Sequence, residues 1–174
     1  SMATRELWLK LNPLLYVPAI PVLIYETRNY RGNTPTKPML GNRTRLALDG
    51  REKIEFKKSL MLMLFGSKIP VMVYIFKQET SKDEFIDKKS VIYILNGQTQ
   101  GVEPKIFISQ EVGYRNLKDY MLVAVDCSQI GTIARQELFM ASRDRLKKGR
   151  YYNELRNDII SLLKNDPDIS QKDQ

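Results

Sequence analysis

Residues 96–101, which read Asn-Gly-Gln-Thr-Gln-Gly, have the composition of a loop that could bind an anion. The two glycines allow backbone conformations in which amides approach an anion closely, and Gln98 and Thr99 add side-chain donors. The alternative is a plain Asn-Gly turn, one of the commonest turn patterns, and the hexapeptide alone favours the turn. The glycine and lysine spacing of a Walker A loop or of a dinucleotide fingerprint is absent from it.

The stretch Ser142-Arg143-Asp144-Arg145 is a second place where phosphate chemistry is conceivable. Arginine has a permanent charge and a planar fork of donors, which suit it to stabilising a phosphoryl group during transfer. The alternative, again favoured by the residues alone, is a charged turn between two helices. In that case Arg143 or Arg145 would pair with Asp144 or Glu137.

Strands are predicted where short apolar, β-branched runs end at turn residues. These runs are residues 22–25, 60–65, 69–76, 91–95 and 121–125, and a further short strand could begin at Thr44. Gly66-Ser67-Lys68 is expected to join the second and third runs as a hairpin. The unbroken apolar run at 121–125 predicts a central strand that is covered on both faces.

Helical spacing of apolar residues begins after Asp126. One helical repeat is formed by Ile133, Glu137 and Met140, and an amphipathic stripe by Leu155, Ile159, Leu162 and Leu163. A shorter helix is predicted to run from Pro104 to Ile108, because proline suits the first turn of a helix. The order of elements predicts an α+β fold, a two-layer sheet with helices mainly on one face.

Length and composition limit the chain to one domain and exclude several kinds of site. The 174 residues allow one domain over residues 3–165, after an expected tag remnant at 1–2 and before a flexible tail at 166–174. The absence of histidine and the single cysteine, Cys127, exclude histidine acid–base catalysis, the usual zinc sites and an internal disulfide. No apolar run is long enough to span a membrane and no signal peptide is evident. We therefore expect a cytoplasmic protein without a metal site.

The formal net charge of +8 makes a polyanion a candidate partner. The basic excess lies in the first 60 residues, which contain 11 basic and 5 acidic side chains. The candidates for nucleic-acid contact are Arg28, Arg31, Lys37, Arg43 and Arg45. A nucleic-acid-binding module is therefore one alternative function, and a scaffold that mediates homodimer contacts is another.

Three segments together resemble the middle segment of the ninety-kilodalton heat-shock chaperones. They are Met-Leu-Val-Ala-Val-Asp-Cys-Ser at 121–128, Met-Ala-Ser-Arg-Asp at 140–144, and a helix over 152–163. In these chaperones a Ser-Arg-acid turn opens the closing helices, and its arginine reaches the γ-phosphate of ATP held by the preceding domain. The resemblance implies that role for Arg143, with Ser142 and Arg145 in support.

Residues 96–100 are similar to the Gly-Gln-Thr-Lys loop of the transducer domain in gyrase-type topoisomerases, whose lysine contacts ATP. Here Gln100 occupies the lysine position, and Lys105 is a displaced substitute. The resemblance implies a nucleotide-sensing loop made of Asn96, Gly97, Gln98, Thr99, Gln100 and Lys105.

Both families belong to the GHKL ATPases, and the combination looks most like large bacterial GHKL-type ATP-binding proteins. The nucleotide-binding motifs of these ATPases are missing from this sequence. The resemblance therefore implies a transducer domain that docks on a GHKL ATPase domain of the same polypeptide, with the fold named after the second domain of a small-subunit ribosomal protein. The isolated chain is expected to be neither an enzyme nor a cofactor protein, since ATP and Mg²⁺ are implied only in the full-length protein.

Overall fold

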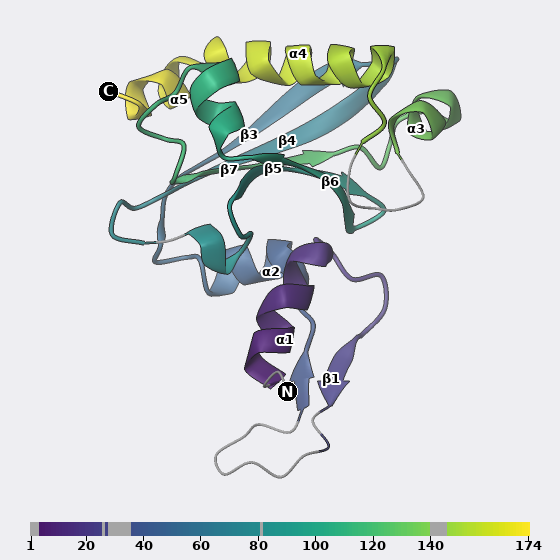
Figure 1. Cartoon of the computed structure of the whole chain (residues 1–174), viewed down its shortest axis with the longest axis vertical. Helices are drawn as coiled ribbons and strands as arrows, with labels where there is room; N and C mark the ends of the chain where they lie inside the picture. Colours follow the sequence, from purple (N-terminus) through teal and green to yellow (C-terminus); the bar gives the residue numbers. More distant parts are fainter. Residues whose placement is uncertain (1–3, 26, 28–35, 81, 140–145) are drawn as a thin grey trace.

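A central sheet with helices on both faces organises the chain (Figure 1). The computed structural model describes residues 4–25, 27, 36–80, 82–139 and 146–174. Its elements are α1 (Thr4–Leu11), η1 (Asn12–Leu14), β1 (Leu23–Tyr25), β2 (Thr36–Pro38), α2 (Gly41–Leu48), β3 (Ile54–Leu64), β4 (Ser67–Phe76), η2 (Lys82–Glu84), β5 (Lys89–Leu95), β6 (Gln98–Pro104), η3 (Ile108–Val112), β7 (Met121–Asp126), α3 (Thr132–Leu138), α4 (Arg150–Lys164) and α5 (Pro167–Lys172). Among the described residues, no helix is long and apolar enough to cross a membrane.

Five strands form one mixed sheet in the order β3-β4-β7-β5-β6. Neighbouring strands are antiparallel, except β5 and β7, which run parallel. The predicted hairpin forms between β3 and β4, at a turn in which Phe65 and Gly66 have φ angles of 54° and 67°. The predicted α+β class is confirmed, and β7 is the middle strand, as its apolar sequence predicts.

The middle strands divide their side chains between two hydrophobic cores, because successive strand residues point to opposite faces. In β7, Met121, Val123 and Val125 belong to the core on the α4 side. Leu122 and Ala124 belong to the core on the α2 side. Both faces of β7 are therefore covered, which explains its uninterrupted apolar run.

Helix α4 packs on the first face through a single stripe. Leu155, Ile159 and Leu163 are fully buried, as their helical spacing predicts, and Leu162 is half-buried. Burial of each such side chain stabilises the fold by about 1.5–3 kcal/mol. The stripe fixes the helix that follows the arginine-bearing stretch 142–145.

The chain end forms helix α5 (Pro167–Lys172), where the sequence predicts a flexible tail over 166–174. The Asp166 carboxylate caps this helix by accepting hydrogen bonds from the backbone amides of Asp168 and Ile169, both at 3.1 Å. Lys58 of β3 donates to the same carboxylate at 2.9 Å, and Ile169 is fully buried. A cap, an ion pair and a buried side chain thus hold this segment on the domain.

The prediction of a strand beginning at Thr44 is wrong, because Gly41–Leu48 form α2. The first two amides of this helix donate to Asn12 Oδ1 at 3.1 Å and to the Leu15 carbonyl at 2.8 Å. The first amides of a helix have no acceptor within the helix, and here a distant part of the chain supplies acceptors for them.

The prediction of a helix running from Pro104 to Ile108 is wrong at its start, although residues 106–108 are helical. Pro104 is the last residue of β6, an edge strand that pairs with β5. Proline is tolerated at the edge of a sheet because its missing N–H interrupts no ladder there. Helical backbone begins at Ile106 and continues into η3.

Candidate functional site

Asn96 and Gly97 form a tight hairpin turn between β5 and β6. Both have positive φ angles, 51° and 77°, as a two-residue hairpin turn of this type requires. The Gly97 carbonyl accepts hydrogen bonds from the backbone N–H groups of Tyr16 at 2.7 Å and Val17 at 3.0 Å. A Cβ at position 97 would lie 2.1 Å from the Val17 carbonyl oxygen, so a side chain does not fit. The geometry is that of a plain Asn-Gly turn, and the turn contacts the chain's own N-terminal segment.

The side chains that follow the turn also make contacts within the chain. Thr99 Oγ1 donates to the Pro13 carbonyl at 2.9 Å. Gln100 Nε2 donates to Gln98 Oε1 at 3.1 Å, and Gln98 forms an isolated β-bridge with Leu15. These contacts attach η1 and the residues after it to β6.

Lys105 lies beyond the far end of β6. The 7 residues of this strand separate it from the turn, which at about 3.3 Å per residue is roughly 23 Å. The Lys105 ammonium pairs with Asp119 at 2.5 Å. That hydrogen bond raises the pKa of Lys105 and lowers the pKa of Asp119. The structure therefore does not bring Lys105 to the turn at Asn96.

The ends of β5 and β7 meet beside the turn, because the two strands are parallel. Ser128 Oγ accepts a hydrogen bond from the Asn96 N–H at 2.9 Å and donates to Asp126 Oδ1 at 2.5 Å. Arg135 of α3 donates to the Ser128 carbonyl at 3.0 Å. Two of the segments on which the resemblance rests, the Asn-Gly turn and the Val-Asp-Cys-Ser strand end, are thus in direct contact.

The arginine-bearing stretch lies outside the described residues, and with it Ser142, Arg143 and Arg145. Its two flanks are described, and they pair with each other. Phe139 and Leu146 form an antiparallel bridge, and the Lys147 N–H donates to the Leu138 carbonyl at 2.7 Å. Leu146 is buried and packs against Gly101 of β6. The base of the stretch is therefore fixed on the strand that follows the Asn-Gly turn.

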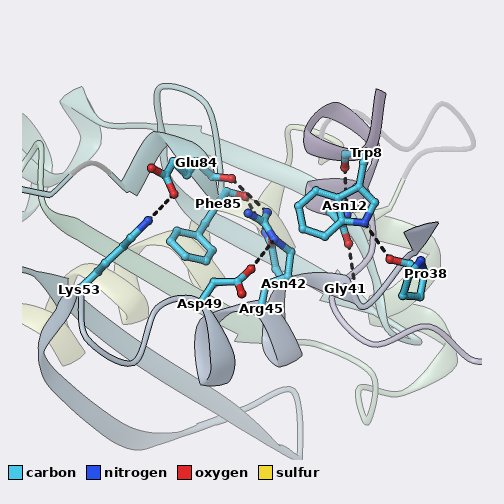
Figure 2. A network of polar contacts seen from close by, with 10 residues as sticks. All are labelled: Trp8, Asn12, Pro38, Gly41, Asn42, Arg45, Asp49, Lys53, Glu84 and Phe85. Carbon is cyan, nitrogen blue, oxygen red and sulfur yellow. Dashed lines mark hydrogen bonds and ion pairs between the residues drawn. The ribbon is translucent and has the colours of Figure 1, made fainter. Parts of the chain in front are cut away.

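Arg45, a candidate for nucleic-acid contact, is buried inside a polar network (Figure 2). Its guanidinium carbon lies 4.6 Å from the ring centre of Trp8 and 4.9 Å from that of Phe85. Nη1 donates to the Glu84 carbonyl at 3.0 Å, and Nε lies 3.5 Å from the Asp49 carboxylate. Burial lowers the pKa of Arg45, and Asp49 opposes that effect. Arg45 therefore stabilises the packing of α2 and is not available to a nucleic acid.

The same network fixes α1 and β2 (Figure 2). Trp8 Nε1 donates to the Pro38 carbonyl at 2.7 Å, and the Lys37 ammonium lies 5.1 Å from the centre of the Trp8 ring. Asn42 Nδ2 donates to the Phe85 carbonyl at 2.8 Å. Two further basic candidates, Arg28 and Arg31, lie outside the described residues.

A cavity of about 570 Å³ between the sheet and α2 is lined by the remaining basic candidate, Arg43. The other polar side chains that line it belong to Tyr16, Lys57, Tyr74 and Asp126. Sequence reasoning missed this cavity, because its residues come from separate elements and form no local motif. Its volume is in the range of small-molecule sites.

Within the described part of the chain, no group of three or more His, Cys, Asp or Glu side chains could hold a metal ion. Comparisons of the sequence and structure with family models, curated proteins and solved structures give no match. The geometry of the chain itself, together with the sequence resemblance, therefore carries the functional argument.

Proposed function

We propose that this chain is a transducer domain that docks on a separate GHKL-type ATP-binding domain and offers Arg143 to the γ-phosphate of ATP. The ATP-binding domain holds the nucleotide and Mg²⁺. The transducer domain converts the state of the nucleotide into a change in domain arrangement. The proposal rests first on the resemblance of residues 96–100, 121–128 and 140–144.

The observation that carries the proposal is that segments far apart in the sequence meet around β5, β6 and β7. Asn96 contacts the end of β7 through Ser128. Leu146, which follows the arginine-bearing stretch, packs on Gly101 of β6. Segments that contact one bound nucleotide together must lie close together, and these segments do.

An arginine that stabilises phosphoryl transfer acts by position and charge, so its base must be held firmly. The bridge between Phe139 and Leu146 closes the stretch at both ends. Behind it, α4 is fixed by its buried leucine and isoleucine stripe. These flanks suit a short stretch that reaches toward a neighbouring domain.

The alternative of a nucleic-acid-binding module is weaker, because the guanidinium of Arg45 is buried and Lys37 lies over the Trp8 ring. On the transducer proposal the isolated chain does not hydrolyse ATP. An arginine and a turn hold neither the base nor the metal ion of a bound nucleotide.

The test is ATP turnover by the GHKL-type ATPase domain of the longer protein, measured alone and with this chain added or fused. We expect no turnover by the chain alone and a clear increase when the two are combined, with heat-unfolded chain as the control. Equal turnover with and without the chain would contradict the proposal. So would hydrolysis by the chain alone that is lost on substituting its own residues.

A further inference from the structure

The cavity between the sheet and α2 has an apolar wall. Met72, Ile94 and Ala124 contribute to it from three neighbouring strands, on the face opposite α4. Val17 and Ala47 line it from the N-terminal segment and from α2. Such a wall can remove an apolar group from water.

Two cations also line this cavity, Arg43 from α2 and Lys57 from β3. Both side chains are exposed, and neither forms a hydrogen bond or an ion pair with any described residue. The Lys57 ammonium lies 5.6 Å from the centre of the Tyr74 ring. By contrast, the nearby Lys53 and Lys58 are paired with carboxylates. Two unpaired cations from different elements at one cavity favour a negatively charged group there.

The buried part of the lining carries two hydroxyl groups that lie close together. Tyr16 is 7 % exposed and Tyr74 is 3 % exposed, and their hydroxyl oxygens are 3.5 Å apart. Neither hydroxyl has another hydrogen-bond partner among the described residues. One hydrogen at most can serve the contact between them, so the second remains free to donate. A tyrosine hydroxyl is protonated at neutral pH, and burial raises the pKa of Tyr16 further.

One carboxylate, that of Asp126, lines the same cavity. Its Oδ1 already accepts hydrogen bonds from the Ser128 N–H at 3.0 Å and from the Ser128 hydroxyl at 2.5 Å. The lining therefore presents two cations against one carboxylate that is partly satisfied within the chain. This balance suits a ligand with a single anionic group.

We propose that this cavity binds a small organic acid, meaning a molecule with one carboxylate or phosphate group on an apolar body. The anionic group contacts Arg43 and Lys57 and accepts a hydrogen bond from the tyrosine pair. The apolar body packs against the wall around Met72. The site uses no residue of the stretch 142–145, but Gly97, Ala124 and Asp126, which line it, belong to the segments 96–100 and 121–128 that the transducer proposal also uses. Binding of the acid requires no ATP-binding domain, so it is tested on this chain alone.

The test uses anilinonaphthalene sulfonate, a fluorescent probe with one anionic group on an aromatic body, titrated into the folded chain. We expect saturable binding that weakens about 3-fold or more in Arg43→Met and in Lys57→Met, and at least 10-fold in the double variant. Arg51→Met and Lys148→Met are the matched controls, because these exposed cations lie outside the cavity. Equal affinity in the double variant and the controls would overturn the proposal.

Competition then identifies the anionic group. Hexanoate and hexyl phosphate should displace the probe, and the stronger of the two assigns a carboxylate or a phosphate ligand. Hexylammonium, with the same apolar body and a positive charge, should displace it poorly. Displacement by hexylammonium as strong as that by both anions would overturn the proposal, because the cavity would then be selecting apolar area alone.

A measurement on the unaltered chain keeps the proposal testable should the double variant not fold. Titration with hexanoate should shift the backbone amide resonances of Val17, Ala47 and Ala124, which line the cavity from the N-terminal segment, α2 and β7. If these resonances do not move at a saturating concentration of hexanoate, or if only resonances elsewhere move, the proposed site is wrong.

Discussion

Gly101 of β6 lies so close to Leu146 that a Cβ at position 101 would be 2.9 Å from Leu146 Cγ and 3.0 Å from its Cδ2. Gly101 has no positive φ, so space alone and not backbone conformation excludes a side chain there. Gly101 belongs to the strand after the Asn-Gly turn, and Leu146 closes the arginine-bearing stretch. The contact joins the two segments that the transducer proposal requires to act together.

Gly101→Ala should therefore destabilise the domain, by about 1–3 kcal/mol, as overpacking of a fitted contact does. In a Leu146→Ala background the same substitution should cost close to nothing, because the space above position 101 is then open. The coupling between the two positions should be about 1–2 kcal/mol. Urea unfolding of the two single variants and the double variant measures it.

The matched control for this cycle is Gly131→Ala, since a Cβ at position 131 would meet no atom within 4 Å. Its cost should be the same with Leu146 or Ala at position 146. Additive effects of Gly101→Ala and Leu146→Ala would show that the two residues do not share one packing contact.

Cys127 should be inert toward thiol reagents in the native chain. Its side chain is fully buried, and burial raises the pKa of the thiol to about 12. The thiolate, which is the reactive form, is therefore scarce at pH 8. We expect slow labelling by Ellman's reagent without denaturant and fast labelling at the urea midpoint of unfolding. Fast labelling of the native chain would show that β7 does not end as described.

The raised pKa of Cys127 also predicts that the free energy of unfolding falls in alkali. Its folded-state pKa lies above the ordinary value of 9.0, so the protonated form is favoured by folding. This contribution is fully present below pH 9 and is lost as the pH rises toward 12. A Cys127→Ala variant should lose less stability than the parent between pH 8 and pH 10. Identical pH profiles would contradict the prediction.

Asp166→Ala should release α5, since it removes the helix cap and the ion pair with Lys58. Loss of an N-cap costs about 1–2 kcal/mol. Asp166→Asn, which keeps a capping oxygen but not the charge, is the control and should cost less. Hydrogen exchange at Ile169 measures the release. Equal protection in Asp166→Ala and the parent would show that Asp166 does not hold the helix.

Low pH should weaken the attachment of α5, as Asp166→Ala does. Burial alone would raise the pKa of Asp166, but the hydrogen bonds from Lys58 and from the amides of Ile169 and Asp168 outweigh it, and the net shift is downward. The stability that this carboxylate contributes is present above its ordinary pKa of 3.8 and is lost as the pH falls through its lower folded-state pKa. Protection of Ile169 should therefore fall below pH 4, and it should fall less in Asp166→Asn.

Sequence patterns were sufficient to predict those helices and strands in which the buried side chains recur with the regular spacing of the element. The apolar run of β7 and the stripe of Leu155, Ile159 and Leu163 each follow the periodicity of the element that they form. The Asn-Gly turn was also predictable from local sequence, because a two-residue hairpin turn needs two positive φ angles, which Asn and Gly adopt readily.

Elements that depend on distant contacts were not predictable in this way. Helix α2 lacks a cap of its own and takes acceptors from Asn12 and Leu15. Strand β6 is polar, and its pairing with β5 rather than its composition makes it a strand. Helix α5 carried an overlooked signal, since Asp166 and Pro167 are a typical N-cap and first helical residue. The cavity could not be anticipated, because Tyr16, Arg43 and Lys57 meet only in the folded chain.

Turnover of ATP by the full-length protein with Arg143→Ala tests the transducer proposal most directly. Arg145→Ala is the matched control, because it removes the same charge from the same stretch at a position to which the resemblance gives only a supporting role. We predict that Arg143→Ala lowers the rate on the order of 10³-fold with little change in nucleotide affinity, as loss of an arginine finger does. Arg143→Lys should restore little, because an ammonium cannot reproduce the bidentate fork. Small and equal effects at Arg143 and Arg145 would contradict the proposal and leave this stretch a charged surface turn.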